Sequence, residues 1–178
     1  MNIFYTNKNP RLSAEYLDDL RLNKMILESC QMLSTTLHCL VENPPENLYK
    51  RTHENHPCSK WTRESKENFK WHLELLCYMQ AEKLYRQGIL EKPLFDNTSL
   101  QSFSSLYLTY KDKLHKSFQK LFPTFLEYYY KIDWQKLELT PHADCSNIES
   151  DKTIEEKYKI CLEEKWKNDK RPPKFTRR

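Results

Sequence analysis

The chain contains a single glycine, Gly88, among its 178 residues. Glycine supplies the positive-φ and close-approach positions that phosphate-binding loops, dinucleotide-binding folds and hairpin-rich β folds need. Long helices need almost none, so the composition favours helices throughout. A chain of this length also suits one packed domain. We therefore predict an all-α fold, a single domain spanning residues 1–178 with three to four long helices plus short ones.

Local signals predict where the helices begin and end. Asn9 followed by Pro10 is typical of an N-cap with proline at the first helical position. We expect a short helix over 10–19 and a longer one over 22–40, which ends before Pro44 because proline disfavours helix at the preceding residue.

Further along the chain, apolar spacing predicts a helix over 59–88, with Gly88 at the C′ position. A third long helix is expected over 100–121 and closed by Pro123, while the state of 125–134 stays open. Residues 139–151 are expected to form a loop. Thr153 and Glu156 form a capping-box pattern that predicts a last helix to about 167.

The helix over 22–40 separates two kinds of side chain on opposite sides. The apolar side consists of Leu22, Ile26, Leu33 and Leu37. The polar side is a stripe of Arg21, Lys24, Glu28, Gln31 and Thr35. Two interpretations are open: a solvated face with an ordinary Lys24–Glu28 pair, or the wall of a cleft that holds an anion beside an acid/base group.

Charge and hydropathy restrict partners and compartment. The net charge of +4 is compatible with a polyanion, and a basic tail occupies residues 166–178. Phe175 in this tail could stack on a base or dock on the protein itself. No apolar run approaches the roughly 20 residues of a membrane span, and the start lacks a signal-peptide core, so we expect an intracellular protein with no membrane contact.

The six cysteines are therefore expected to be reduced thiols. Potential metal ligands gather between residues 38 and 58, but their spacing matches no known zinc module. Buried thiols and polar loop histidines explain them better, so we expect no metal. These residues are His38, Cys39, His53, His56 and Cys58.

Four features occur in a fixed order: the Arg21/Lys24/Glu28 stripe, the loop His53-Glu54-Asn55-His56-Pro57, the helix start containing Arg63 and Asn68, and Arg171-Pro172-Pro173. In this order the chain resembles the pyrimidine-dimer DNA glycosylases of the phage endonuclease V type and their viral and bacterial relatives. The likeness touches about two-thirds of the chain, and residues 93–135 look like an insertion or a divergent region.

The resemblance implies an all-α enzyme that binds double-stranded, damaged or modified DNA, flips a nucleotide out of the stack and acts on its glycosidic bond without a cofactor. Glu28 corresponds to the catalytic glutamate, and Arg21 to a position that contacts DNA around the flipped nucleotide. Other residues expected to contact the nucleic acid are His53, Asn55, His56, Arg63, Asn68, Lys165 and Arg171. It also suggests a viral or phage source and a role in DNA repair.

In that family the nucleophile is the N-terminal amine, exposed after removal of the initiator methionine, and a lyase step follows through a Schiff base. Here Asn2 is too bulky for efficient removal of Met1. The amine is then that of Met1, or it is replaced by Lys24, one turn before Glu28.

Other interpretations remain. The scaffold could serve an enzyme that processes a nucleotide or modified base without strand cleavage, or a catalytically silent nucleic-acid or regulatory protein. Asn55-His56-Pro57 could be a simple turn. Trp61, Phe69 and Trp71 fit a core better than a base-stacking surface.

Overall fold

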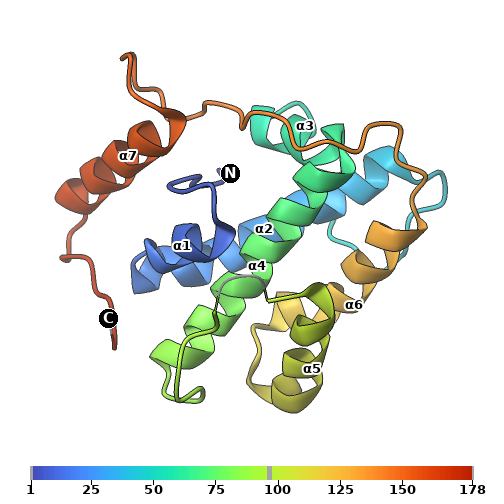
Figure 1. The fold of residues 1–178 in the computed structure, drawn as a ribbon, viewed down its shortest axis with the longest axis horizontal. Helices are drawn as coiled ribbons and strands as arrows, with labels where there is room; N and C mark the ends of the chain where they lie inside the picture. Colours follow the sequence, from blue (N-terminus) through green and yellow to red (C-terminus); the bar gives the residue numbers. More distant parts are fainter. Residues whose placement is uncertain (1, 96–97, 178) are drawn as a thin grey trace.

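Helices α2 (Asp19–Leu40) and α4 (Lys66–Arg86) pack against each other at the centre, with the other helices around them (Figure 1). The computed structural model describes residues 2–95 and 98–177. Within these ranges there is no strand, which confirms the predicted all-α fold. The remaining elements there are α1 (Pro10–Glu15), α3 (Pro57–Glu64), α5 (Leu100–Tyr110), the 3-10 turn η1 (Lys111–Lys113), α6 (Lys116–Lys131) and α7 (Ile154–Asn168).

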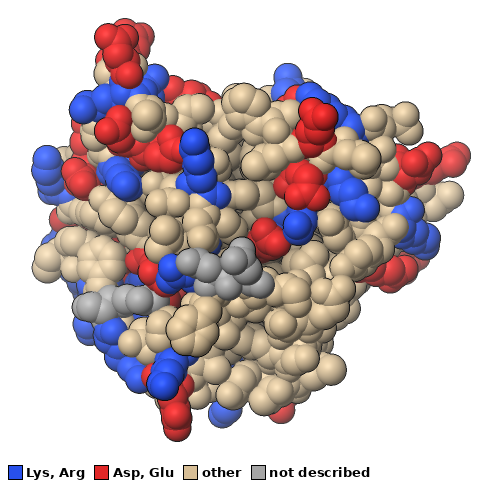
Figure 2. Space-filling model, in the orientation of Figure 1, with Lys and Arg blue, Asp and Glu red and all other residues tan. Residues whose placement is uncertain are grey.

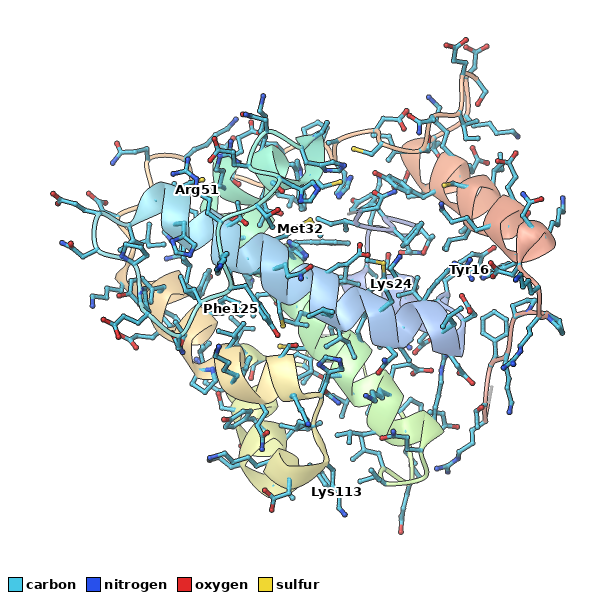
Figure 3. All side chains as sticks on the ribbon, turned by 180° about the vertical axis from the view of Figure 1, so that it is seen from behind. Tyr16, Lys24, Met32, Arg51, Lys113 and Phe125 are labelled. Carbon is cyan, nitrogen blue, oxygen red and sulfur yellow. The ribbon has the colours of Figure 1, made fainter. Side chains whose placement is uncertain are left out.

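The core lies on the predicted apolar side of α2. Leu22, Ile26, Leu33 and Leu37 are each at most 2% exposed. From behind, α2 lies across α4 (Figure 3), and α4 is buried on most sides because it also contacts α1, α3 and α6. A helix covered in this way needs apolar residues around most of its circumference. None of the described helices combines the length and apolar character that crossing a membrane requires.

The aromatic residues early in the chain belong to this core, as predicted. Trp61, Phe69 and Trp71 are at most 5% exposed. The Trp71 indole donates to the carbonyl of Lys8 at 2.8 Å, which fixes the segment before α1 against α4. These rings therefore organise the interior and are not available to stack on nucleic-acid bases.

Most predicted helix ends are confirmed. Asn9 caps α1 by accepting from the Arg11 amide at 2.9 Å, with Pro10 at the first position. Gly88 adopts φ +75° just after α4, the left-handed geometry that favours glycine at C′. Thr153 and Glu156 form a complete capping box at the start of α7.

The single helix predicted over 59–88 is wrong, because it is interrupted at Ser65. Ser65 is extended (φ −149°, ψ 164°) and its hydroxyl accepts from the Asn68 amide at 3.1 Å. The serine thus ends α3 and caps α4. A serine in a helical pattern competes for backbone hydrogen bonds in this way.

The helix predicted over 100–121 and closed by Pro123 is also wrong. The chain breaks after α5 at η1, and Pro123 lies inside α6, which continues to Lys131. Pro123 has no N–H for the carbonyl of Gln119 one turn earlier. The Tyr107 hydroxyl donates to that carbonyl at 2.8 Å, so a contact from α5 satisfies the acceptor that the proline leaves free.

The last third of the chain returns to the start of α2. Residues 139–151 form the predicted loop, which leads to α7 at the edge of the fold (Figure 1). Beyond α7 the tail docks on the protein: the Asp19 amide donates to the Lys174 carbonyl at 2.8 Å, and Phe175 packs edge-on against Trp166 at 5.6 Å. Of the two interpretations for Phe175, this structure has the docked one.

Candidate functional site

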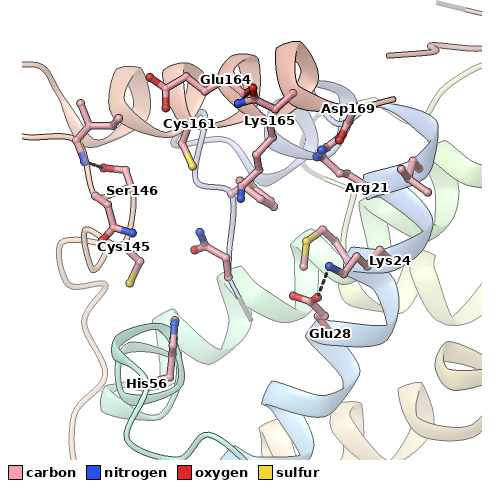
Figure 4. A pocket seen from close by; sticks show the side chains of 17 residues that line it. Arg21, Lys24, Glu28, His56, Cys145, Ser146, Cys161, Glu164, Lys165 and Asp169 are labelled. Carbon is pink, nitrogen blue, oxygen red and sulfur yellow. Dashed lines mark hydrogen bonds and ion pairs between the residues drawn. The ribbon is translucent and has the colours of Figure 1, made fainter. Parts of the chain in front are cut away.

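A cleft of about 870 Å³ opens between α2, the start of the chain, the start of α3 and the wall formed by α7 with the loop before it (Figure 4). The polar stripe of α2 forms one side of this cleft from Arg21 to Glu28. The cleft interpretation of the stripe therefore applies to its first half. Further along α2, Thr35 is buried and hydrogen-bonded to the backbone of Thr52, outside the cleft.

Glu28 and Lys24 lie one helical turn apart on the cleft side of α2. Lys24 Nζ is 3.4 Å from Glu28 Oε1, and the exposed side-chain fractions are 67% for the lysine and 15% for the glutamate. The carboxylate therefore lies in the cleft wall while the ammonium is at its rim (Figure 4). An acid in this position can hold or move a proton at a group bound in the cleft.

His56 faces the same space from the N-cap of α3, where its Nδ1 accepts from the Cys58 amide at 3.2 Å. Burial lowers the pKa of His56, and the negative charge of Glu28 offsets part of this effect. The imidazole is thus largely neutral near pH 7, and because Nδ1 accepts from the Cys58 amide, the ring has its Nε2–H as a donor toward a bound group.

The beginning of the chain reaches the cleft. Asn2 and Phe4 line it, and Ile3 and Phe4 are buried. Phe4 packs edge-on against Tyr158 of α7 at 6.4 Å, which fixes the direction of this segment. Met1, one of the two amines expected to react, lies outside the described residues.

Arg21 lines the cleft, but its guanidinium is engaged by two carboxylates. Its Nη1 lies 2.7 Å from Asp169 Oδ2 and 3.2 Å from Asp18 Oδ1. Asp18 is buried and also accepts from the Trp166 indole at 2.8 Å. Arg21 thus links α2 to the C-terminal end of α7. A contact between Arg21 and a DNA phosphate would compete with the carboxylates of Asp18 and Asp169.

The other predicted contact residues divide by position. Lys165 is exposed and lines the cleft. His53, Asn55 and Arg171 are exposed but do not line it, and Arg63 donates to the Glu54 carbonyl at 2.6 Å.

Asn68 is completely buried. Its amide donates to the Trp61 carbonyl at 2.8 Å and to Thr140 Oγ1 at 2.7 Å, and its Oδ1 accepts from the Thr140 amide at 2.9 Å. All of its side-chain hydrogen-bonding groups are thus used inside the protein. In this structure Asn68 attaches the loop over 139–151 to α4 and does not reach the surface.

Sequence reasoning missed most of the far wall of the cleft, from which it had predicted only Lys165. The residues that it missed come from the loop before α7, from α7 and from its C-cap: Cys145, Ser146, Asn147, Ile148, Cys161, Glu164, Asn168 and Asp169. No spacing rule relates them to α2, because the contacts join residues more than 80 positions apart. The one local signal was the capping box at Thr153, which predicts α7 but not the face that it turns inward.

The charge in the cleft is mixed. Among the described residues that line it, Arg21, Lys24 and Lys165 oppose Glu28, Glu164 and Asp169. On the face in Figure 2, basic and acidic side chains are likewise interspersed. Any attraction for a polyanion must then come from exposed lysines at the rim and not from a uniformly positive wall.

The first half of the chain matches a known protein family. Residues 1–87 match the model of the family described as pyrimidine dimer DNA glycosylase. This segment runs from the chain start through α4 and includes Glu28, Lys24, Arg21 and His56, whereas the far wall of the cleft lies outside it. No curated protein and no solved structure matches the chain. Over residues 1–87 the chain is therefore similar to the pyrimidine dimer DNA glycosylases, the family that its sequence motifs indicated.

Proposed function

We propose that this protein is a DNA glycosylase with an associated lyase step, acting on a damaged or modified nucleotide that leaves the duplex and enters the cleft. The observation that carries this proposal is the position of Glu28: its side chain lies in the cleft wall, and Asn2 at the start of the chain lines the same cleft. The family match over residues 1–87 supports DNA as the substrate.

The size of the cleft suits a nucleotide. Its volume of about 870 Å³ falls within the roughly 300–1,000 Å³ typical of small-molecule sites. Moving a nucleotide out of the stack costs a few kcal/mol, and cations at the phosphates offset this cost. Lys24 and Lys165 are exposed at the rim, where the phosphates on either side of the flipped nucleotide would lie.

In the proposed reaction a neutral amine attacks C1′ of the flipped nucleotide. The C1′–N glycosidic bond breaks, and the base leaves with its bonding electrons and takes up a proton. Opening of the sugar and loss of a proton from nitrogen give a Schiff base, from which β-elimination expels the 3′ phosphate. Glu28 stabilises the cationic intermediate and transfers protons.

Two amines are candidates for this attack, the α-amine of Met1 and Nζ of Lys24. An α-amine has an ordinary pKa of about 7.7–8.0, which leaves a useful neutral fraction near pH 7. Lys24 Nζ is 3.4 Å from Glu28 Oε1, close enough for proton exchange. Mapping the covalent adduct distinguishes them.

Borohydride trapping tests the proposal. The protein is incubated with duplexes that carry a pyrimidine dimer or an abasic site, and the Schiff base is reduced to a stable adduct. Glu28→Gln should bind DNA normally and lose adduct formation by about 10²–10⁴-fold. Glu164→Gln is the matched control, because Glu164 also lines the cleft but is exposed on α7.

Three results would contradict the proposal: no adduct with either duplex, unchanged turnover in Glu28→Gln, or an adduct on a peptide that contains neither Met1 nor Lys24. DNA binding itself should weaken steeply with added salt, since phosphate contacts release counterions.

A further inference from the structure

A His-Cys-Cys cluster lies in the cleft wall, formed by residues from two distant parts of the chain. The potential ligand atoms of His56, Cys58 and Cys145 all lie within 4.8 Å of one another. Cys58 Sγ is 3.5 Å from Cys145 Sγ although the residues are 87 positions apart in sequence. We propose that these three side chains bind a Zn²⁺ ion.

The donor set selects the kind of metal. Two thiols and an imidazole are the ligands that zinc prefers, whereas Mg²⁺ and Ca²⁺ take oxygen ligands. Two thiolates bound to zinc at about 2.3 Å in tetrahedral geometry stand about 3.8 Å apart. The observed sulfur separation of 3.5 Å is near that value, so the ion requires only small movements of the side chains.

The fold positions the ligands from two separate segments. His56 and Cys58 are fixed at the start of α3, as its N-cap and second helical residue. Cys145 is fixed by Tyr158, whose hydroxyl accepts from the Cys145 amide at 3.1 Å and donates to the Ala143 carbonyl at 2.9 Å. The cluster is therefore arranged before any ion arrives.

The same loop is ordered on its other side. Asp144 accepts from the Ser146 amide at 3.1 Å and pairs with Lys157 of α7 at 2.9 Å. The loop and α7 are thus joined, and a metal bound to Cys145 would connect both to α3. An ion here would fasten the far wall of the cleft to the part of the chain that carries Glu28.

Three protein ligands leave a fourth position, which faces the cleft. Cys58 is buried, whereas His56 and Cys145 line the cleft, so the open side of the cluster is toward its interior. Asn2 Oδ1 lies 3.6 Å from Cys58 Sγ on that side. Zinc sites with three protein ligands retain a water or bind a substrate atom at such a position.

Binding has two chemical consequences. The two thiol protons are released to solvent, so one Zn²⁺ with two thiolates and a neutral imidazole leaves the cluster uncharged. His56 also stops capping α3. A metal on Nδ1 occupies that nitrogen, and a metal on Nε2 leaves the ring proton on Nδ1. In both cases Nδ1 can no longer accept from the Cys58 amide.

Cobalt substitution tests the site directly and does not depend on the glycosylase activity. The full chain, reduced and free of metal, is titrated with Co²⁺ and then with Zn²⁺. The expected result is one ion per chain, thiolate-to-cobalt charge-transfer bands, strong visible bands of tetrahedral cobalt, and their displacement by zinc.

Variants locate the ion. Cys145→Ser should lose the charge-transfer bands and the stoichiometric ion, and Cys145 is only half-buried, so this change spares the core. Cys161→Ser is the control, a half-buried cysteine that lines the same cleft outside the cluster. His56→Gln should weaken binding. Failure of the reduced wild-type chain to bind cobalt, or retention of the bands in Cys145→Ser, overturns the proposal.

Discussion

Buried polar residues that join distant segments can resemble binding residues in a sequence. Asn68 is such a case: it lies near a helix start beside Arg63, where DNA contacts were expected, yet it is buried with three hydrogen bonds to Trp61 and Thr140. By contrast, Lys24, Glu28 and Lys165 do line the cleft. Residue type and local spacing identified the helix stripe, but not which polar side chains are used internally.

We expect Asn68→Ala to destabilise the fold by about 2–4 kcal/mol, because it removes three hydrogen bonds, among them those to the Trp61 carbonyl and the Thr140 amide, and empties a fully buried site. Urea unfolding measures this loss. The folded fraction should bind DNA as the wild type does. Asn55→Ala, at an exposed position, is the control and should leave stability nearly unchanged. A variant with full stability and weakened DNA binding would instead support a contact role for Asn68.

At the scale of helices, the ends that depend on neighbouring residues were predictable. The Asn9 cap, Gly88 and the Thr153/Glu156 box all act within one turn. The continuation of α6 through Pro123 was not predictable, because its compensation comes from Tyr107 on another helix. Tertiary hydrogen bonds override the local rule at this position.

This arrangement predicts a coupled pair. Tyr107→Phe should cost about 1–2 kcal/mol, since the Gln119 carbonyl loses its donor. Pro123→Ala restores a backbone N–H to that carbonyl, so the same Tyr107 change should cost less in the Pro123→Ala background. Urea unfolding of the two single variants and the double variant gives the interaction energy. Additive effects would show that the hydroxyl does not compensate for the proline.

For the whole molecule, α7 and the loop before it complete the cleft from outside the family match. Their attachments include Tyr158 with Phe4 near the loop, and Arg21 and Asp18 with Asp169 and Trp166 at the other end. The contacts of Arg21 with Asp169 and of Asp18 with Trp166 each span 148 positions. The sequence therefore indicated the wall that carries Glu28, whereas the opposite wall required the folded chain, because its contacts follow no local period.

The protein interior contains two buried histidines, His72 and His142, that sequence reasoning did not single out. His72 is buried beside Thr62, at 2.9 Å from Nδ1, and His142 stacks on Tyr5 with ring centroids 4.5 Å apart. Thr62 donates its own proton to the Cys58 carbonyl, so Nδ1 of His72 donates to Thr62. Nδ1 of His142 donates to the Ala143 carbonyl. The Nε2 atoms of both are buried without a hydrogen-bond partner, so protonation would place an unpaired charge in the core.

Stability should consequently decrease as the pH falls below neutrality. Burial lowers the pKa of His72 to about 3 and that of His142 to about 4, from 6.5. Below pH 6.5 the two histidines bind protons in the unfolded chain but not in the folded protein. Their contribution to stability is therefore complete above this pH and is lost progressively toward pH 4. The loss is up to about 1.4 kcal/mol per pH unit for each histidine. Urea unfolding from pH 7.5 to 4 should show a smaller slope for His142→Phe, which keeps the stacking on Tyr5. His53→Asn, at an exposed histidine with φ 49°, should follow the wild type. An unchanged slope in His142→Phe would mean that His142 takes up its proton at the same pH in the folded protein as in the unfolded chain.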